Sequence, residues 1–572
     1  MTSEADKMDT TDPVERLDLN LDKSLLDPKF EGYKVTMDNP KVEGKKFSVK
    51  GATVQRSPEL FSLQHMKLFG ESNLLFVNDF QTGENVHLYR FTSTGFIEEM
   101  IYNKPTENWS FSNVARFELP NAGAYPPSII FTNDNFAVVC NGLDLITVFH
   151  IELVNDSWTK LLEHRPCEEK GISLVEARYV AGSLQVILHR VEERTKENKK
   201  TDLFRSKIYW LTIAVGENAL SDRVTIERVR EITQEGHYEA CTLDNFGRLV
   251  ILGTKTPFIS SDDSGIITQS DAKTTKSSTP RRFWSQKDDD LTVMFTFDFP
   301  VNKEDVSVQL SSHSIFLTVK GEVLLDGTLG GTIDPTDFVD TVQGNQLLLR
   351  LRTTNKDNWV VLMEGDQQHV EQPNSETTKK AFAEMEKDEL VVGAEQMEEC
   401  DESELMLTFY WFDGDKQAVV KECDASCRQI LFTSHSGNAP ARICLRHDVD
   451  GVVWNFNDQT PYHEATLHAF GYVQASKTMR VWCGAAPNSS YACIVEANNH
   501  ALLYWQRKAV GNELFNRKTS SQVTHISQQQ VLHVRVDGDV HGEDAIIGVF
   551  AANDALFFLT PSEVLVARFQ VD

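Results

Sequence analysis

The stretch FWSQKDDDLTVMFTFDFP, residues Phe283–Pro300, decides how the middle of this chain folds. Apolar residues occupy every second position of its second half, the spacing that places side chains on one face of a β-strand: Leu291, Val293, Phe295 and Phe297. Three later runs alternate in the same way, at residues 306–310, 315–319 and 347–351. Four strands with one apolar face each predict a small antiparallel β-sandwich over residues 283–363, long enough to bury a core of its own.

The segments on either side of this sandwich are also rich in strands. Asn141-Gly142 lies between two apolar runs and predicts a tight hairpin turn. Neither segment shows the long periodic helices of βαβ units. We expect an all-β chain in which residues 25–260 and 405–572 together build a β-propeller of about seven blades, at about 40 to 45 residues per blade. No regular Gly-His or Trp-Asp pairs mark the blades, so this prediction depends on strand density.

The same pattern predicts how the chain is divided. Residues 1–24 are polar and acidic and are expected to be a disordered tail. Residues 261–282 read as a polar linker, and residues 364–404 as a second linker with a short helix. The sandwich is therefore predicted to be an insertion in a propeller loop. An open ring would leave unpaired edges, so the last strand, near VLVARFQV, should complete or neighbour a blade begun by early residues.

Charge and composition exclude several kinds of function. The formal net charge is −28, which disfavours direct contact with a nucleic-acid backbone. No run of 18 apolar residues exists, so no membrane insertion is expected, and the acidic N-terminus lacks the apolar core of a secretory signal. The cysteines number nine, an odd count without a Cys-x-x-Cys pair, which indicates free thiols in a reducing compartment.

The central module resembles the CS domain of the NudC family. The resemblance rests on FWSQ and the acidic turn after it, on the strand LTVMFTF, on LTVKG and LLDGTL, and on a late tryptophan. Trp284 matches the opening tryptophan of that domain, Asp326 and Gly327 match its Asp-Gly-x-Leu stretch, and the late tryptophan is Trp359. Phe338 departs from the pattern, because many relatives have a tryptophan there.

The flanking segments extend the resemblance over nearly the whole chain. LLDPKFEGYKV (residues 25–35), LRHDVD (445–450) and GYVQASK (471–477) are similar to stretches of a NudC-family protein whose CS domain is likewise central, between two β-rich segments. The resemblance implies a co-chaperone or adaptor that works beside cytosolic heat-shock chaperones. The partners it implies are that machinery, β-propeller client proteins and dynein-related complexes, in the cytoplasm and the nucleus.

The residues themselves offer no enzyme motif, no metal cluster and no cofactor site. The segment DGTLGG (326–331) lacks the Gly-Lys-Ser/Thr of a phosphate loop and is interpreted as a turn. Two alternatives to the co-chaperone stay open: a static propeller scaffold in a nuclear or transport complex, and a propeller enzyme, which would need a central polar pocket.

Four residues are the main candidates for a functional role outside simple packing. A catalytic role is one interpretation of Arg446, His447 and Asp448. Adjacent strand residues point to opposite faces, so the alternative is a turn held by hydrogen bonds. Trp284 could contact a partner or could cover the edge of the sandwich.

Overall fold

A computed structural model describes residues 14–263, 281–363 and 406–569, apart from short gaps within each range, of which the longest are 194–203, 216–223 and 535–544. The chain forms two compact units: Met1–Ile267 together with Cys400–Asp572, and Thr268–Glu399. The helix expected between 364 and 404 lies outside the described residues.

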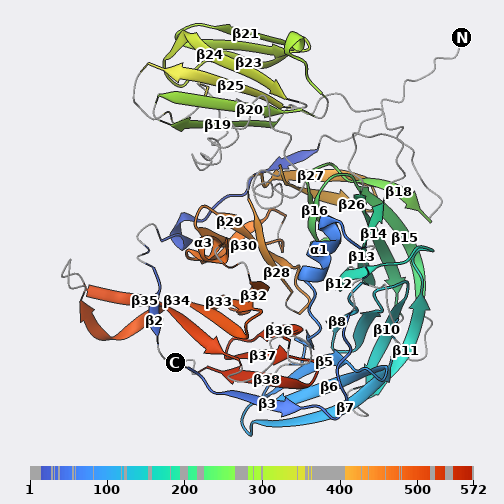
Figure 1. Ribbon diagram of the computed structural model, residues 1–572. Helices are drawn as coiled ribbons and strands as arrows, with labels where there is room; N and C mark the ends of the chain where they lie inside the picture. The colour runs from blue at the N-terminus through green and yellow to red at the C-terminus, as the bar shows by residue number, and fades with distance from the viewer. Residues whose placement is uncertain are drawn as a thin grey trace, which may run out of the picture. The chain divides into compact units, whose positions relative to one another are not determined.

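The larger unit is a propeller of seven sheets in the described residues, and these follow one another around a common centre (Figure 1). We number the blades 1 to 7 in chain order. Blade 1 contains β4 (Phe76–Val77), β5 (Asn85–Phe91), β6 (Phe96–Asn103) and β7 (Asn108–Arg116); blade 2 contains β8 (Ser128–Asn133), β9 (Phe136–Cys140), β10 (Ile146–Glu152) and β11 (Ser157–His164); blade 3 contains β12 (Ser173–Val180), β13 (Ser183–Glu193), β14 (Phe204–Ala214) and β15 (Thr225–Gln234), with β18 (Phe258–Asp262) beside β15.

The remaining blades combine strands from distant parts of the chain. Blade 4 contains β16 (Tyr238–Leu243), β17 (Leu249–Gly253), β26 (Thr408–Asp413) and β27 (Ala418–Asp424), with β1 (Glu15–Leu17) at its edge; blade 5 contains β28 (Ile430–Ser434), β29 (Arg442–His447), β30 (Asp450–Asn455) and β31 (Tyr462–Leu467); blade 6 contains β32 (Arg480–Ala485), β33 (Tyr491–Glu496), β34 (His500–Phe515) and β35 (Gln522–His533), with β2 (Lys34–Thr36); blade 7 contains β36 (Gly548–Ala551), β37 (Ala555–Leu559) and β38 (Glu563–Arg568), with β3 (Val42–Lys46).

Blades stack face to face, and this explains the weak repeat in the sequence. Strands β9, β17 and β37 are buried at every residue. A strand that is covered on both faces is selected for a continuous apolar run, such as FAVVC, LVILG or ALFFL, in place of period-two alternation. The blades are therefore visible in the sequence as dense apolar runs with turns between them.

The ring is closed by strands from the two ends of the chain. β3 pairs antiparallel with β38, from Val42 opposite Ala567 to Lys46 opposite Glu563. The predicted assembly of the propeller from N-terminal and C-terminal segments is thereby confirmed, and the VLVARFQV strand does complete a blade begun by early residues. Closure satisfies backbone groups that an open edge would expose.

The N-terminal region differs from the expectation of a disordered tail at residues 1–24. Residues 1–13 lie outside the described part, but β1 runs parallel to β27, and Leu17, Leu19 and Leu21 pack against the apolar core between blades 4 and 5. The alternation of leucines in RLDLNLDKSLL gives this short segment one apolar face. The acidic residues between the leucines give the segment the overall composition of a disordered tail, which explains the wrong prediction.

The module is inserted inside blade 4. The first two strands of that blade, β16 and β17, precede the module, and β26 and β27 follow it, while β17 and β26 pair directly from Leu249 opposite Phe412 to Gly253 opposite Thr408. On the way out the chain forms β18, which adds to blade 3. The blade is thus completed only when both sides of the insertion come together.

The module itself is a sandwich of two antiparallel sheets. One sheet has the order β19 (Arg281–Lys287), β20 (Asp290–Thr296), β25 (Gln346–Thr353) and β24 (Ile333–Gln343); the other has the order β21 (Val306–Leu310), β22 (Ser314–Val319) and β23 (Glu322–Thr328). The four predicted runs are β20, β21, β22 and β25. The strands β19, β23 and β24 were not among the four predicted. In β24, Pro335 and a register shift between Asp334 and Phe338 break the alternation.

Candidate functional site

Two of the flanking stretches that resemble the NudC family, LRHDVD and GYVQASK, lie against each other on blade 5. Gly471, in helix α3 (Phe470–Ala475), has no room for a side chain, because a Cβ there would lie 2.8 Å from Arg446 Cγ and 2.9 Å from the carbonyl oxygen of Asp450. The backbone N–H of Tyr472 donates to the carbonyl oxygen of Val449 at 3.0 Å. Glycine at 471 therefore permits the close approach that fixes α3 on the turn between β29 and β30.

The third stretch, LLDPKFEGYKV, reaches the same place from the N-terminal segment. The ring of Phe30 stacks on the ring of His468, with 5.3 Å between centroids. The Tyr33 hydroxyl donates to the carbonyl oxygen of His468 and accepts a hydrogen bond from Gln506 Nε2 at 3.0 Å. Burial raises the pKa of Tyr33 and lowers the pKa of His468. We call Phe30, Tyr33 and residues 446–450 and 468–472 the signature junction.

The structure places Arg446, His447 and Asp448 in the turn of this junction. Arg446 Nε donates to the backbone carbonyl of Asp448 at 2.9 Å. Asp448 has a φ of 51°, in the left-handed region that aspartate tolerates better than most residues, and its side chain is exposed. His447 is the last residue of β29 and is half-buried. These residues form a turn that Arg446 stabilises through its hydrogen bond to the backbone.

The two tryptophans of the module belong to its core. Trp284 on β19 is 3% exposed and Trp359 is 5% exposed, and both pack with Leu291, Phe295 and the other apolar residues of the sandwich. The backbone N–H of Trp359 donates to Gln286 Oε1 at 2.7 Å and so ties the end of the module to its first strand. Trp284 therefore offers almost no surface to a partner.

Asp326 and Gly327 lie at the end of β23, before the glycine-rich turn that makes room for Trp359. Asp326 is exposed, opposite Phe316. Gly327 has a φ of 152°, and a Cβ at Gly331 would lie 2.3 Å from Trp359 Nε1. Only glycine fits beneath the indole at position 331, which lies two residues beyond the matched Asp-Gly-x-Leu stretch.

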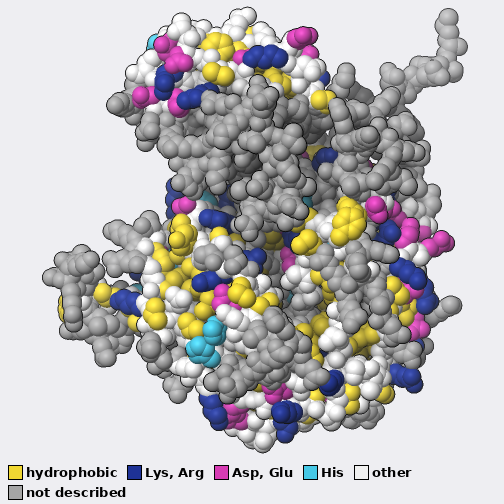
Figure 2. Space-filling view, in the orientation of Figure 1, with side chains coloured by type: hydrophobic (Ala, Val, Ile, Leu, Met, Phe, Trp, Pro, Cys, Tyr) yellow, Lys and Arg dark blue, Asp and Glu magenta, His cyan; other side chains and the backbone are white. Residues whose placement is uncertain are grey.

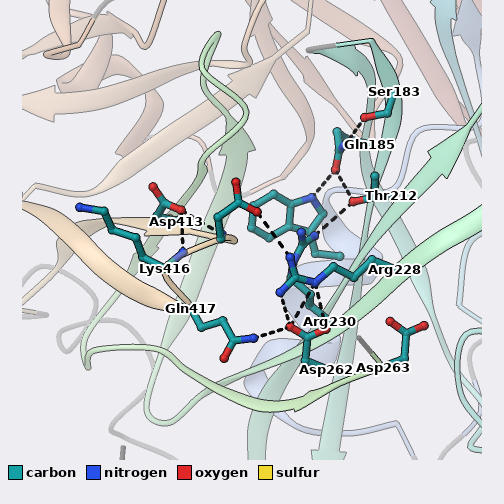
Figure 3. A network of polar contacts seen from close by, with 12 residues as sticks. Ser183, Gln185, Thr212, Arg228, Arg230, Asp262, Asp263, Asp413, Lys416 and Gln417 are labelled. Atoms are coloured by element: carbon teal, nitrogen blue, oxygen red, sulfur yellow. Dashed lines mark hydrogen bonds and ion pairs between the residues drawn. The ribbon is translucent and has the colours of Figure 1, made fainter. Parts of the chain in front are cut away.

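A polar network holds the chain where it leaves the propeller for the module (Figure 3). Asp262, the last residue of β18, accepts hydrogen bonds from Arg228 Nε at 2.9 and 3.1 Å and from Arg228 Nη2 at 2.5 Å. Gln417 Nε2, in the turn between β26 and β27, donates to the same carboxylate at 2.7 Å. The Asp262 side chain is fully buried, so one carboxylate joins the strand before the insertion to the turn after it.

A second arginine backs this network. The Arg230 guanidinium lies over the Trp210 ring, 4.4 Å from its centroid, and donates to Thr212 Oγ1 at 3.2 Å (Figure 3). Burial, and then the neighbouring charge of Arg228, lower the pKa of Arg230 to about 10. The two arginines and Asp262 hold the chain at the end of β18, where it leaves the propeller. Sequence reasoning missed them because the Asp262 and Gln417 contact spans 155 residues, and no local pattern marks its members.

Further polar contacts join helix α1 (Leu63–Gly70) to the segment before β8, and the loop between β28 and β29 to β12. This helix lies inside the ring beside β12 and β16 (Figure 1). His65 Nε2 is 3.1 Å from the Tyr125 hydroxyl, and Ser62 Oγ caps the helix by accepting from the backbone N–H of His65 at 3.2 Å. Asn438 Nδ2, between β28 and β29, donates to the Tyr179 carbonyl of blade 3 at 3.4 Å. The Ser62 and His65 pair is thus part of a helix cap.

Within the described residues, no group of three or more histidine, cysteine or acidic side chains is arranged to hold a metal ion. In the same part of the chain, no helix is both long and apolar enough to cross a membrane.

Comparison with known proteins agrees with the resemblance seen in the residues. Residues 280–352 match the family model of the CS domain. NudC domain-containing protein 1 of Mus musculus is 25% identical over 597 residues, covering 96% of this chain and 98% of the relative, and the Xenopus tropicalis protein of the same name is 25% identical over 588 residues with the same coverage. The chain is thus similar to NudC domain-containing protein 1 from end to end, and the predicted resemblance is confirmed.

Solved structures with detectable likeness include Sqt1 from Chaetomium thermophilum, 10% identical, which covers 88% of this chain and 98% of its own with a TM-score of 0.33. A nuclear movement protein from E. cuniculi is 18% identical, covering 14% of this chain and 96% of its own with a TM-score of 0.13.

Proposed function

We propose that this protein is a non-enzymatic co-chaperone or adaptor of the NudC type, in which the CS module contacts heat-shock chaperone machinery and the propeller binds partner proteins. The observation that carries the proposal is the CS-domain match at 280–352, inside a compact unit with its own core, within a chain that is similar to NudC domain-containing protein 1 over 96% of its length.

The division into two units supports separate tasks. The sandwich core is formed by residues of the module alone, and the propeller is closed by its own strands β3 and β38. Two bodies with independent cores can each present a binding surface. We further propose β-propeller client proteins and dynein-related complexes as partners, and the cytoplasm and nucleus as the places where the protein works.

The test compares what co-purifies with two forms of the protein in cells. One form is the full chain, and the other has residues 268–399 replaced by a Gly/Ser linker. The deletion form is used only if circular dichroism shows that its propeller is folded. We expect the deletion to lose heat-shock chaperones and to keep the partners of the propeller. If the deletion changes no partner, the chaperone role fails and a static propeller scaffold explains the protein better.

A surface variant locates the contact more closely. Lys303 on η2 (Lys303–Asp305) is 63% exposed, and its Nζ lies 2.6 Å from Asp340 Oδ1. Lys303→Glu inverts the charge at little cost in stability, since exposed ion pairs contribute about 0 to 1 kcal/mol. The Lys303→Glu/Asp340→Lys double variant restores the pair with opposite polarity. Loss of chaperone in both forms assigns the effect to surface charge, whereas loss in the single variant alone assigns it to the broken pair.

A further inference from the structure

Blade 4 carries a fifth strand that the ring does not need for its closure. The blade already has the four strands β16, β17, β26 and β27, and β1 is added in parallel outside β27, with Glu15 opposite Lys421 and Leu17 opposite Cys423 (Figure 1). The ring is closed elsewhere, by β3 and β38. We call residues 15–22, which comprise β1 and the residues directly after it, the strap. Without the strap each of the seven blades still has four strands or more.

The edge strand β27 presents a cation to the strand beside it. Lys421 is 6% exposed although it lies on the outermost of the four strands of its blade. Its Nζ lies 3.0 Å from Glu15 Oε2 in the strap and donates to the carbonyl oxygen of Gln459 at 3.3 Å. A lysine is rarely buried unless a partner for its charge is supplied. The edge of blade 4 is therefore matched to a strand that brings a carboxylate to this position.

Blades 4 and 5 together accommodate the rest of the strap. Three leucines of the strap are half-buried and pack against the apolar core between these blades: Leu17, Leu19 and Leu21. The intervening residues Asp18 and Asn20 are exposed. At the end of the strap, His463 Nδ1 on β31 accepts a hydrogen bond from the backbone N–H of Asp22 at 3.2 Å. The site thus holds a segment with an apolar side chain at every second position.

Blade 2 shows how this ring protects an edge that has no added strand in the described residues. β11 is the last strand of its sheet and carries Lys160 and Glu163, which are 54% and 46% exposed and pair at 2.8 Å. Figure 2 shows charged side chains of both signs along the side of the ring where β11 lies in Figure 1. Exposed charges of this kind discourage the addition of a further strand. The buried lysine of β27 is the opposite arrangement, and it favours a strand at this edge.

The contacts of the strap are those of a segment that can be released from a complete sheet. β1 pairs with β27 over three residue pairs, in the parallel arrangement that is the less stable per residue. The outer ion pair, between Arg16 and Glu422, is largely exposed and adds little. By contrast β3, which closes the ring, pairs antiparallel with β38 over five residue pairs. Extended peptides bind to other sheets by the same addition of a strand to an edge.

We propose that the outer edge of blade 4 is a binding site for an extended segment of a partner protein, and that the strap fills this site and so inhibits binding. The strap itself defines the chemistry of that segment, which has a carboxylate opposite Lys421 and leucines two, four and six residues after it. The partner strand takes the place of β1 beside β27. The inference deepens the proposed function, since it locates partner binding on the propeller, and it requires nothing of the CS module.

The test compares the full-length protein with a full-length variant whose strap is weakened, Leu17→Asp/Leu19→Asp. The probe is a fluorescein-labelled peptide with the sequence of residues 14–26, VERLDLNLDKSLL, and its binding is measured by fluorescence anisotropy. We expect the peptide to bind the variant at least tenfold more tightly than the wild type, because the intact strap competes at an effective concentration of about a millimolar. A peptide with serine in place of the leucines at 17, 19 and 21 should bind neither form.

Substitutions on the blade assign the peptide to the edge of β27. In the weakened-strap variant, Lys421→Met should lower the affinity for the peptide about tenfold. A peptide with Glu15→Gln should already bind more weakly by the same factor, and Lys421→Met should add no further loss, because the two substitutions remove the same ion pair. Lys416→Met, at an exposed lysine in the turn before β27, is the matched control and should leave the affinity unchanged.

Several results would overturn the proposal. They are equal affinity of the peptide for the wild type and the weakened-strap variant, no binding to that variant at millimolar peptide, full affinity of the serine peptide, or an equal effect of Lys416→Met and Lys421→Met. Loss of the melting transition of the propeller in Leu17→Asp/Leu19→Asp would do so too, since the ring would then need the strap.

One further outcome would identify a different occupant. A wild-type dimer in sedimentation velocity that the weakened-strap variant does not form would assign the edge to the strap of a second copy of this chain, in place of a partner protein. None of these results affects the pull-down with the 268–399 deletion, so failure here is distinguishable from failure of the chaperone role.

Discussion

Among the contacts that hold the chain at the insertion, we expect those of the Asp262 carboxylate to contribute most to stability. Asp262→Asn keeps the size of the side chain and one acceptor oxygen but removes the charge that three hydrogen bonds from Arg228 now satisfy. Breaking a buried ion pair by removing one partner costs about 3 to 5 kcal/mol. Because the amide oxygen still accepts a hydrogen bond, we expect the lower end, a loss of about 3 kcal/mol in the free energy of unfolding of the propeller.

Asp415 provides a matched control. Its carboxylate lies 3.5 Å from Nη1 of the same Arg228, but its side chain is 95% exposed, whereas that of Asp262 is fully buried. Exposed pairs contribute little, so Asp415→Asn should change stability by less than about 0.5 kcal/mol. The two substitutions are chemically identical and face one guanidinium. Their difference therefore measures what burial and the closer hydrogen bonds of Asp262 add to a pair with the same arginine.

Urea unfolding followed by circular dichroism gives the overall loss, and hydrogen exchange measured by mass spectrometry locates it. In Asp262→Asn the amides of β18 and of the turn between β26 and β27 should exchange faster, while those of blades 1 and 7 keep their protection. Equal destabilisation by the two asparagine variants, or unchanged protection of β18, would refute the idea that the buried carboxylate fastens the chain at the insertion. Removing both partners, in Arg228→Met/Asp262→Leu, should cost less than Asp262→Asn.

Three further outcomes follow from the structure. Gly471→Ala should lower stability by about 1 to 3 kcal/mol, because its Cβ would lie 2.9 Å from the fixed carbonyl oxygen of Asp450, and thermal melting checks it. Gly331→Ala should displace the Trp359 indole and lower the melting transition of the module in calorimetry while sparing that of the propeller. Burial raises the pKa of Asp79 to about 6 in the folded protein, whereas its pKa in the unfolded chain is near 4. The stability that the protonated carboxyl contributes is therefore fully present below pH 4 and is lost as pH rises through 6. Asp79→Asn should therefore stabilise the protein at pH 7, by at most about 3 kcal/mol, and flatten the change in melting temperature between pH 4 and 6.

Controls for these substitutions are available in the same chain. A Cβ at Gly70 would meet nothing within 4 Å, so Gly70→Ala should be neutral or slightly stabilising at the end of α1. Asp134→Asn changes an exposed carboxylate in a turn of blade 2. A drop in stability for Gly70→Ala equal to that of Gly471→Ala would show that the crowding argument is wrong, and an Asp79→Asn variant less stable than wild type at pH 7 would do the same for the buried carboxyl.

The amino-acid sequence by itself determined many of the strands and, for four strands of the sandwich, which face is apolar. Leu291, Val293 and Phe295 alternate, and the strand they predict is β20, with these three side chains in the core of the sandwich. The dense apolar runs of the flanks predicted a propeller of about seven blades, and seven sheets form in the described residues of that unit. These predictions succeed because the face of a strand and the position of a turn depend on neighbouring residues along the chain.

Tertiary structure alone decided which distant residues meet. Nothing local in the sequence shows that β1 lies beside β27 or that Gln417 shares a carboxylate with Asp262. The same holds for the signature junction, where Gly471 and Arg446 come from different stretches that were recognised separately. Burial, too, is a tertiary property, and it makes Trp284 part of a core although its position at the start of the module leaves both roles open. The physical reason is that strand pairing between remote segments is fixed by the closure of the ring and the packing of its blades, which depend on the whole chain at once.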